Sequence, residues 1–344
     1  MLKRTFSLIL VLFVAQWARA AEKLIGGPYV VNVGHRTATV VWIPETPGAA
    51  SELRPQKITL SGLEPGKTYS YDVLGGEAGK GSFKTAPTGA AKFRFVVYGD
   101  TRTRHEMHQR VIEAISKAEP DFVLHTGDLV SDGRDTAQWP VFFSIERELL
   151  RKTVFFPSLG NHERNNPQYY EFFDVRTPYY SFNWGACHFV VLNSDFGNAA
   201  KSAEEKEAFW AEQRRWLEDD LRKSKRAALR FLVFHHPPFT AVKRRQGGKH
   251  PVQALVPLLE QYKVTAVFNG HDHNYQHHLK GGVHYITTGG GGAPLYDVDA
   301  PIAGITQKVD KSEHFVEVNV DGRRARVEAH ALDGRLIDTI ELTP

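Results

Sequence analysis

Only one cysteine, Cys187, occurs in the sequence, so no disulfide bond can form within the chain. Charge of one sign does not dominate, because 43 lysines and arginines face 39 aspartates and glutamates, and this near balance gives no support to a nucleic-acid partner. Internal repeats and low-complexity segments are also absent from the sequence. What remains is a chain of 344 residues with ordinary globular composition, which predicts a large core and two domains.

The first 20 residues resemble a secretory signal peptide. Lys3 and Arg4 precede an apolar run from Phe6 to Ala15, and Ala18-Arg19-Ala20 has the small residues of a cleavage site. The run is short for a membrane span, which takes about 20 residues, so we expect cleavage after Ala20 rather than an anchor. A chain with so little cysteine fits a bacterial periplasm better than a eukaryotic secretory route. We therefore predict a secreted or periplasmic protein without membrane attachment after cleavage.

Residues 24–87 predict a small domain built only of strands. The segment 37–42 alternates like a half-buried strand, and the Pro65-Gly66 turn leads into another strand with Tyr69 and Tyr71 on one face. Short strands separated by turns favour a β-sandwich. The segment resembles a fibronectin type III module, although it is short for that fold, and the corner residues that carry the resemblance are Leu63, Pro65, Gly66, Thr68 and Tyr69. We expect a scaffold or lid for the next domain, joined to it by residues 86–90.

From residue 92 to residue 344 the pattern changes to alternating strands and helices, which indicates an α/β fold. Apolar runs predict strands at 93–98, 122–125, 154–156, 189–192, 229–234, 264–268 and 284–287. Helices are predicted at 108–117, 137–150, 203–224 and 252–262, and closing antiparallel strands at 323–329 and 336–342.

Residues that bind metal ions well follow five of these predicted strands. They are Asp100, Asp128, Asn161 with His162, His235 with His236, and His271 with His273. Ligands of α/β proteins bind where the carboxyl ends of strands open into loops. Side chains two residues apart in an extended chain point to the same side, so His271 and His273 can face one pocket. Each motif alone also fits a turn or a helix cap, but the five together favour one metal site.

Three of the motifs resemble the calcineurin-like metallophosphoesterase superfamily. They are Gly270-His271-Asp272-His273-Asn274, Gly160-Asn161-His162-Glu163 and His235-His236-Pro237-Pro238. The resemblance extends from residue 93 to about residue 297, and the preceding β domain points to the purple acid phosphatases and their bacterial relatives. It implies a four-layer αββα sandwich, in which two mixed sheets pack face to face with helices outside.

The resemblance also implies a site for two divalent metal ions, of Fe, Mn or Zn. Asp128 would bridge the ions, Asp100 and His273 would bind the first, and Asn161, His235 and His271 would bind the second. Two ions about 3.5–4 Å apart can clamp the attacking and leaving oxygens of a phosphoryl transfer and turn a shared water into hydroxide near neutral pH.

Further residues of the chain have candidate roles beside the metal ligands. His162 would donate a proton or hydrogen bond to the leaving group or support the site from behind, and His236 would bind substrate or pack beside Pro237. Arg102 would grip a phosphate or pair with a carboxylate. The basic stretch 243–245 would either meet an anionic substrate or form a solvated loop. The glycine run 289–292 would let the backbone pass close to the metal pocket.

Two positions depart from the pattern of the family. Arg102 stands where many members have a histidine ligand, and Ser131 stands where purple acid phosphatases have their coloured tyrosinate ligand. Water, His105 or His108 would complete the first metal's coordination, and a solvated position at the start of a helix is an equal alternative for His108. We predict no purple colour, so a charge-transfer band at roughly 500–600 nm would contradict this assignment.

We therefore predict an exported phosphoesterase that hydrolyses phosphate monoesters by attack of a metal-bound hydroxide. The alternatives are a phosphodiesterase or nucleotidase that uses the same site, a metal-dependent nuclease, and a binding module without activity. The expected partner is a small phosphorylated substrate, with no nucleic-acid scaffold, and the oligomeric state is left open.

Overall fold

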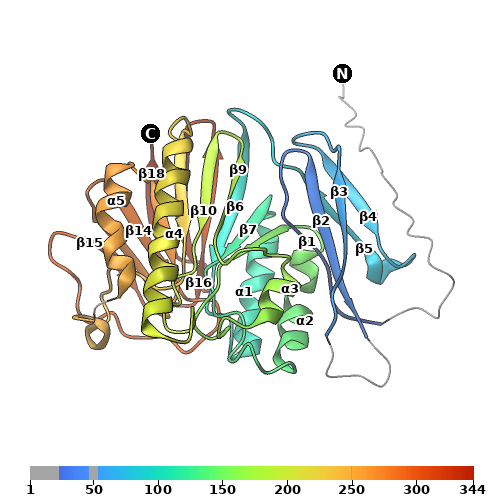
Figure 1. Cartoon of the computed structure of the whole chain (residues 1–344), viewed down its shortest axis with the longest axis horizontal. Helices are drawn as coiled ribbons and strands as arrows, with labels where there is room; N and C mark the ends of the chain where they lie inside the picture. The colour runs from blue at the N-terminus through green and yellow to red at the C-terminus, as the bar shows by residue number, and fades with distance from the viewer. Residues whose placement is uncertain (1–22, 46–52, 249) are drawn as a thin grey trace.

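The computed structural model describes residues 23–45, 53–248 and 250–344 (Figure 1). The predicted signal peptide lies outside the described residues. Two large sheets dominate the described part, and the chain passes from the first sheet to the second and back again. Among the described residues, no helix combines the length and the apolar character that crossing a membrane requires.

The first sheet has nine strands in the order β18-β17-β16-β6-β7-β8-β1-β2-β3. Parallel strands β6, β7 and β8 form its centre, and the last three strands of the chain extend one side. Its strands are β1 (Leu24–Val31), β2 (Thr37–Pro44), β3 (Gln56–Ser61), β6 (Lys92–Tyr98), β7 (Phe122–His125), β8 (Val154–Pro157), β16 (His314–Asp321), β17 (Arg324–Ala331) and β18 (Leu336–Leu342).

The second sheet has seven strands in the order β15-β13-β14-β12-β11-β10-β9. Parallel pairing runs from β10 through β11 and β12 to β14, and antiparallel strands close both sides. Its strands are β9 (Tyr180–Trp184), β10 (Cys187–Val191), β11 (Leu229–Val233), β12 (Ala266–Asn269), β13 (Tyr275–Lys280), β14 (Val283–Thr288) and β15 (Thr306–Asp310).

Aromatic side chains fill the space between the two sheets. Phe95 and Phe122 of the first sheet stack on each other with ring centroids 5.0 Å apart, and Phe189 and Phe231 of the second sheet meet Phe95 edge-on. Such edge-to-face contacts add to the stability that burial of the rings provides. The two sheets therefore share one apolar core.

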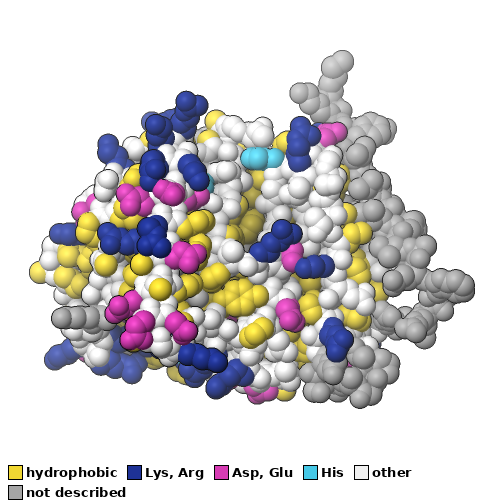
Figure 2. Space-filling view, in the orientation of Figure 1, with side chains coloured by type: hydrophobic (Ala, Val, Ile, Leu, Met, Phe, Trp, Pro, Cys, Tyr) yellow, Lys and Arg dark blue, Asp and Glu magenta, His cyan; other side chains and the backbone are white. Residues whose placement is uncertain are grey.

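Helices cover the outer faces of both sheets and complete four layers, as expected for an αββα sandwich (Figure 1). The first sheet is covered by α1 (His105–Lys117), α2 (Gln138–Leu150) and α3 (Pro167–Phe172), and the second by α4 (Ala203–Lys223) and α5 (Val256–Gln261). A capping box between Ser202 and Glu205 fixes the start of α4. On the face drawn in Figure 2, basic and acidic side chains are interspersed over this helix. The predicted helix 252–262 is divided into the 3-10 helix η3 (Pro251–Leu255) and α5.

The described part of residues 24–87 contains strands β1 to β3, the hairpin of β4 (Thr68–Asp72) and β5 (Lys80–Lys84), and the short 3-10 helix η1 (Glu77–Gly79). The predicted corner is present, because the hydroxyl oxygen of Tyr69 accepts the backbone N–H of Glu64 at 2.8 Å. Tyr69 and Phe83 of the hairpin stack on each other in the same core cluster as Leu60 and Leu63. Similarity to a fibronectin type III module stays a prediction.

One strand joins the N-terminal segment to the rest of the molecule. Strand β1 pairs in parallel with β8, at Val30 and Val154, so the first sheet runs on across the expected domain boundary. Behind this strand, the ring of Tyr29 stacks on Phe143 of α2 with centroids 5.2 Å apart. Residues 86–90 connect the β4–β5 hairpin to β6, and the first sheet contains strands from both sides of this connection.

Candidate metal centre

The five motifs that follow predicted strands meet at one edge of the two sheets. Asp100 follows β6, Asp128 follows β7 and Asn161 lies in the loop after β8, while His235 and His271 come just after β11 and β12 of the second sheet. The carboxyl ends of these parallel strands lie side by side, which brings together side chains that are far apart in sequence.

Three of these residues have left-handed backbone conformations. The φ angles of Asp100, Asp128 and His271 are 60°, 59° and 69°. This region costs a non-glycine residue roughly 1 kcal/mol or more, so the surrounding structure must hold it in place. Part of this support is a hydrogen bond from the backbone N–H of His271 to Oδ2 of Asp100 at 2.9 Å.

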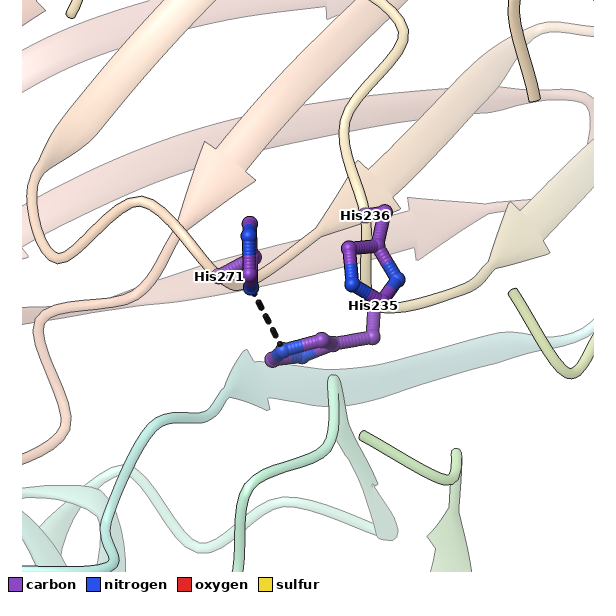
Figure 3. A group of neighbouring side chains, drawn as sticks. All are labelled: His235, His236 and His271. Atoms are coloured by element: carbon purple, nitrogen blue, oxygen red, sulfur yellow. Dashed lines mark hydrogen bonds between the residues drawn. The ribbon is translucent and has the colours of Figure 1, made fainter. Parts of the chain in front are cut away.

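One group of candidate ligands gathers around His235 (Figure 3). Its Nε2 lies 3.1 Å from Nδ1 of His271, 3.1 Å from Oδ1 of Asn161 and 3.3 Å from Oδ1 of Asp128. The opposite ring nitrogen, Nδ1, donates to the backbone carbonyl of Thr126 at 2.9 Å. A carbonyl behind the ring fixes the orientation of a metal-binding histidine, so this arrangement suits a ligand.

A second group contains Asp100, Asp128 and His273, all of which are buried. One ligand atom from each lies within 4.8 Å of the others, and Nε2 of His273 is 3.4 Å from Oδ1 of Asp100. Nδ1 of His273 donates to the carbonyl of Pro294 at 2.7 Å. Asp128 belongs to this group, and its Oδ1 also lies 3.3 Å from Nε2 of His235, so its carboxylate contacts both groups as a bridging ligand would.

The donor atoms present fit divalent cations. With Nδ1–H engaged by a carbonyl, neutral His235 has a lone pair on Nε2, and this lone pair faces the oxygens of Asn161 and Asp128. Acceptor atoms that converge in this way repel one another unless a proton or a metal cation lies among them. Imidazole, carboxylate and amide oxygen together are donors that suit Zn, Mn or Fe.

The charges of the buried ligands are strongly coupled. Burial alone would raise the pKa of Asp128, but the charge and hydrogen bond of His235 outweigh it and hold this pKa below the ordinary aspartate value. Burial would likewise lower the pKa of His235, yet the carboxylate of Asp128 raises it to about 9. Burial and neighbouring cations hold the pKa of His271 well below its usual value. Asp128 and His235 therefore each stabilise the charged form of the other.

His162 and Arg102 both lie beside the carboxylate of Asp128. Nε2 of His162 is 3.8 Å and Nε of Arg102 is 3.4 Å from Oδ2 of Asp128. The backbone N–H of His162 donates to Oδ1 of the same carboxylate, and Nδ1 of its ring donates to the carbonyl of Ser131 at 2.6 Å. For Arg102, the structure thus has the ion pair with a neighbouring carboxylate, while phosphate binding stays a prediction.

His236 lies in the ligand group around His235. Its ligand nitrogen is grouped with those of His235 and His271, and its ring stacks on His250 with centroids 4.5 Å apart. Nδ1 of His236 is 3.0 Å from the hydroxyl of Ser194, and burial and the charge of His235 hold its pKa well below the ordinary histidine value. A neutral ring here can bind a metal or a substrate, and its predicted role in substrate binding stays open.

His108 does not lie in a solvated position, which was one alternative for it. It is 1% exposed, and its Nε2 lies 2.8 Å from Oε1 of Glu146 in α2. The other oxygen of Glu146 accepts the hydroxyl of Tyr98. His108 thus joins α1 to α2 and β6, and the predicted role as an extra metal ligand has no support from these contacts. His105 is exposed at the start of α1.

Glu163 supports the centre in a way that the sequence motif alone did not indicate. Its carboxylate accepts the backbone N–H groups of Asp128 at 2.9 Å, Leu129 at 2.7 Å and Gly160 at 2.7 Å. Burial and the charge of Asp128 raise the pKa of Glu163 to about 8. The only indication in the sequence was that Glu163 lies two residues after Asn161. In the structure, its buried carboxylate joins the loop of Asp128 to the loop of Asn161.

The glycine run 289–292 passes close to the first ligand, as expected. A Cβ atom on Gly289 would lie 2.9 Å from Oδ2 of Asp100, and one on Gly291 would overlap the carbonyl oxygen of Gly99. The backbone N–H of Gly291 donates to that carbonyl at 3.0 Å. Side chains at these positions would push the Asp100 loop away from the centre.

Two curated proteins are similar to this chain in sequence over about two thirds of its length. An uncharacterized protein of Mycobacterium tuberculosis is 26% identical over 277 residues, covering 67% of this chain and 52% of that protein. Purple acid phosphatase 22 of Arabidopsis thaliana is 26% identical over 239 residues, covering 64% of this chain and 52% of that protein. This chain thus spans about half the length of these curated relatives.

Two solved structures resemble this one in fold. Purple acid phosphatase PPD1 from seeds of yellow lupin (Lupinus luteus) has a TM-score of 0.71 at 17% identity, covering 92% of this chain and 74% of that chain. A structure of PhoD has a TM-score of 0.66 at 11% identity, covering 94% of both chains. The family model of calcineurin-like phosphoesterases matches residues 93–275, which is more than half of the sequence and includes every candidate metal ligand. The chain belongs to the calcineurin-like phosphoesterase family.

Proposed function

We propose that the protein is a phosphoesterase that depends on two divalent metal ions and prefers phosphate monoesters as substrates. The observation that carries this proposal is the position of Asp128, which is grouped with Asp100 and His273 and whose Oδ1 also lies 3.3 Å from Nε2 of His235 in the other group of ligand atoms. Asp100, Asp128 and His273 would hold one ion, and Asp128, Asn161, His235 and His271 would hold the other. Bound ions would supply charge neutralisation of the phosphate and a nucleophile drawn from water.

The protein's own side chains would orient and protonate the substrate. His162 is 23% exposed, with its Nδ1 held by the carbonyl of Ser131, so its Nε2 is available to a bound ester. It would donate a proton or hydrogen bond to the leaving oxygen as the P–O bond breaks. Arg102, with a buried Nε that makes no hydrogen bond to the described residues, would hold a phosphate oxygen.

Hydrolysis of p-nitrophenyl phosphate and of bis-p-nitrophenyl phosphate tests this proposal. The protein is first chelated and then reloaded with Zn, Mn or Fe, and its metal content is measured. We expect turnover only after reloading, a faster rate on the monoester, and loss of activity by a factor of about 10² or more in Asp128→Asn, because one of the two ions loses its shared ligand. The matched control is Asp132→Asn, an acidic residue four positions later that pairs with Arg134.

Each contrary outcome has a defined meaning. A faster rate on the diester would replace the monoesterase with a phosphodiesterase. Two bound ions without turnover of either ester would favour a binding module or an enzyme of narrow specificity. A protein that binds no metal ion after reloading would rule out the proposed centre.

We also propose export, on the sequence of residues 1–20. The N-terminal sequence of the protein purified from the periplasm or the medium of a secreting host tests it. Cleavage after Ala20 leaves Ala21 as the first residue, whereas retention of Met1 in the cytoplasmic fraction would contradict export.

A further inference from the structure

A cavity of about 600 Å³ opens beside the metal centre. His236 and His271 line it on the side of the centre, and Arg244, Arg245 and Gln253 line it elsewhere. An ester whose phosphate sits on the centre would extend its remaining part into this cavity. The side chains that line this cavity would therefore determine which esters the protein prefers.

One of the two arginines is already neutralised. Nε of Arg245 lies 3.2 Å from Oδ1 of Asp272, which is fully buried. The other oxygen of Asp272 accepts the hydroxyl of Thr240 and, at 3.1 Å, the side-chain amide of Gln276. Arg245 therefore balances a buried carboxylate and holds the loop against the second sheet.

The other arginine has no such partner. Arg244 makes no ion pair with any carboxylate in residues 23–45, 53–248 and 250–344. Its guanidinium carbon lies 4.3 Å from the ring centroid of Tyr296. A guanidinium placed over an aromatic face keeps its N–H groups free at the edge, where they can bind an anion.

Tyr296 connects Arg244 to the metal centre. Its ring stacks on His273 with centroids 4.0 Å apart and an angle of 24° between the planes. Its backbone N–H donates to the carbonyl of His273 at 2.9 Å. The cation of Arg244 is therefore separated from a candidate metal ligand by the single ring of Tyr296.

The loop that carries Arg244 is anchored on both sides. Arg244 lies in the 3-10 helix η2 (Lys243–Arg245), where the backbone N–H of Lys243 donates to Oδ1 of Asp299 at 2.9 Å. The side-chain amide of Gln246 donates to the carbonyls of Thr240 and Ala300. These bonds distinguish the segment from the freely solvated loop that its sequence also allowed.

We propose that Arg244, supported by Tyr296, binds a second anionic group of the substrate, so that the preferred substrates are phosphate esters whose leaving group carries a carboxylate or another phosphate. The inference rests on the proposed function for the turnover of such esters. The binding of such esters does not depend on the proposed activity, because a metal-loaded centre without activity would still hold the phosphate end. Guanidinium matches both anions through paired N–H donors.

Calorimetric titration of the metal-loaded protein with 3-phosphonopropionate and ethylphosphonate tests the binding. Neither phosphonate can be hydrolysed, and they differ by one carboxylate. We expect about tenfold tighter binding of 3-phosphonopropionate, since a charged hydrogen bond contributes about that factor, and loss of this preference in Arg244→Gln. Lys243→Gln is the matched control, because it removes the same charge from the neighbouring residue, which does not line the cavity.

Turnover of 2-phosphoglycerate and glycerol 2-phosphate tests the role of Arg244 separately from the proposed phosphoesterase activity. We expect a lower KM for 2-phosphoglycerate, and a rise of about tenfold in that KM in Arg244→Gln with a much smaller change for glycerol 2-phosphate. Equal phosphonate affinities, or equal losses in Arg244→Gln and Lys243→Gln, overturn the inference even if both esters are hydrolysed. An Arg244-dependent preference for 3-phosphonopropionate without hydrolysis of either ester supports the inference and counts against the proposed activity.

Discussion

The guanidinium of Arg102 lies against the carboxylate that would bridge the two metal ions, with Nε of Arg102 3.4 Å from Oδ2 of Asp128. We expect Arg102→Gln to lower kcat/KM for p-nitrophenyl phosphate by roughly 10- to 100-fold, because a charged contact to the phosphate is lost. The number of bound metal ions should stay the same, since Arg102 forms an ion pair with a candidate ligand and would not bind an ion itself. Steady-state kinetics and metal analysis of the same preparation measure both quantities.

A neighbouring arginine provides the control for this variant. Arg104 is 39% exposed and pairs with Glu313, so Arg104→Gln removes the same charge without touching Asp128. A similar loss of activity in both variants would mean that the general positive charge, and not the place of Arg102, is responsible. Loss of one metal ion in Arg102→Gln would assign Arg102 to ligand support instead.

Glu163 should be needed for metal affinity although it binds no metal. In Glu163→Gln, an amide NH₂ group would face backbone N–H groups that now donate to a carboxylate oxygen. We expect a loss of about 1–3 kcal/mol in the free energy of unfolding and a decrease in metal affinity of roughly tenfold. Thermal unfolding and metal titration test this, with the exposed Glu171→Gln of α3 as control. Unchanged metal affinity would restrict Glu163 to general stability.

A methyl group on Gly291 should displace the loop of Asp100. Its Cβ would overlap the carbonyl oxygen of Gly99, and backbone atoms cannot move aside as a side chain can. We expect Gly291→Ala to cost about 1–3 kcal/mol and to weaken the binding of the first metal ion. Gly76→Ala is the matched control, because a Cβ there meets no atom within 4 Å and needs no positive φ. Equal melting temperatures of the two variants would show that the loop tolerates the shift.

The stability contributed by Asp338 should depend on pH. Oδ2 of Asp338 accepts the hydroxyl of Tyr275 at 2.9 Å and lies 3.0 Å from Nδ1 of His277. Burial by itself raises the pKa of Asp338, but these contacts outweigh it and hold the pKa below the ordinary value. A lowered pKa in the folded state stabilises the protein above the unfolded-state value of about 3.9, and this contribution is lost as the pH falls through the folded-state value.

We therefore expect Asp338→Asn to lower the free energy of unfolding by about 1 kcal/mol at pH 7, and the difference from the wild type to shrink below about pH 4. Denaturant unfolding of chelated protein at a series of pH values measures this without interference from metal loss. Asp321→Asn, which breaks an exposed ion pair with Lys92, should have little effect at any pH. A difference that stays constant down to pH 2 would exclude the ionised carboxylate as its source.

Much of the candidate site could be predicted because its residue types are unusual at strand ends. His271 and His273 follow a short apolar run, and a polar residue there has few structural reasons to be buried. The sequence could not indicate the left-handed conformations of Asp100, Asp128 and His271, because aspartate and histidine adopt them only where tertiary contacts hold them. The burial of His108 likewise depends on Glu146, which is 38 residues away.

Strands β13 and β16 are not among the strands that the sequence patterns predicted. Strand β13 has the sequence Tyr-Gln-His-His-Leu-Lys, and its polar side chains hide a strand whose first four residues are buried. Strand β16 has the alternating sequence His-Phe-Val-Glu-Val-Asn-Val-Asp, so its signal was present. The pairing of β1 with β8 depends on a contact between residues 30 and 154, and no local pattern encodes such a partner.

The continuity of the first sheet through β1 also limits how this chain can be divided. Removal of residues 24–87 would leave β8 as an open edge, with unpaired backbone groups close to the loop of Asn161, and would uncover the aromatic face of α2 that Tyr29 now covers. Residues 92–344 produced alone would therefore be prone to aggregation through that edge. The boundary that the amino-acid sequence indicates near residue 88 therefore does not coincide with an edge of the first sheet.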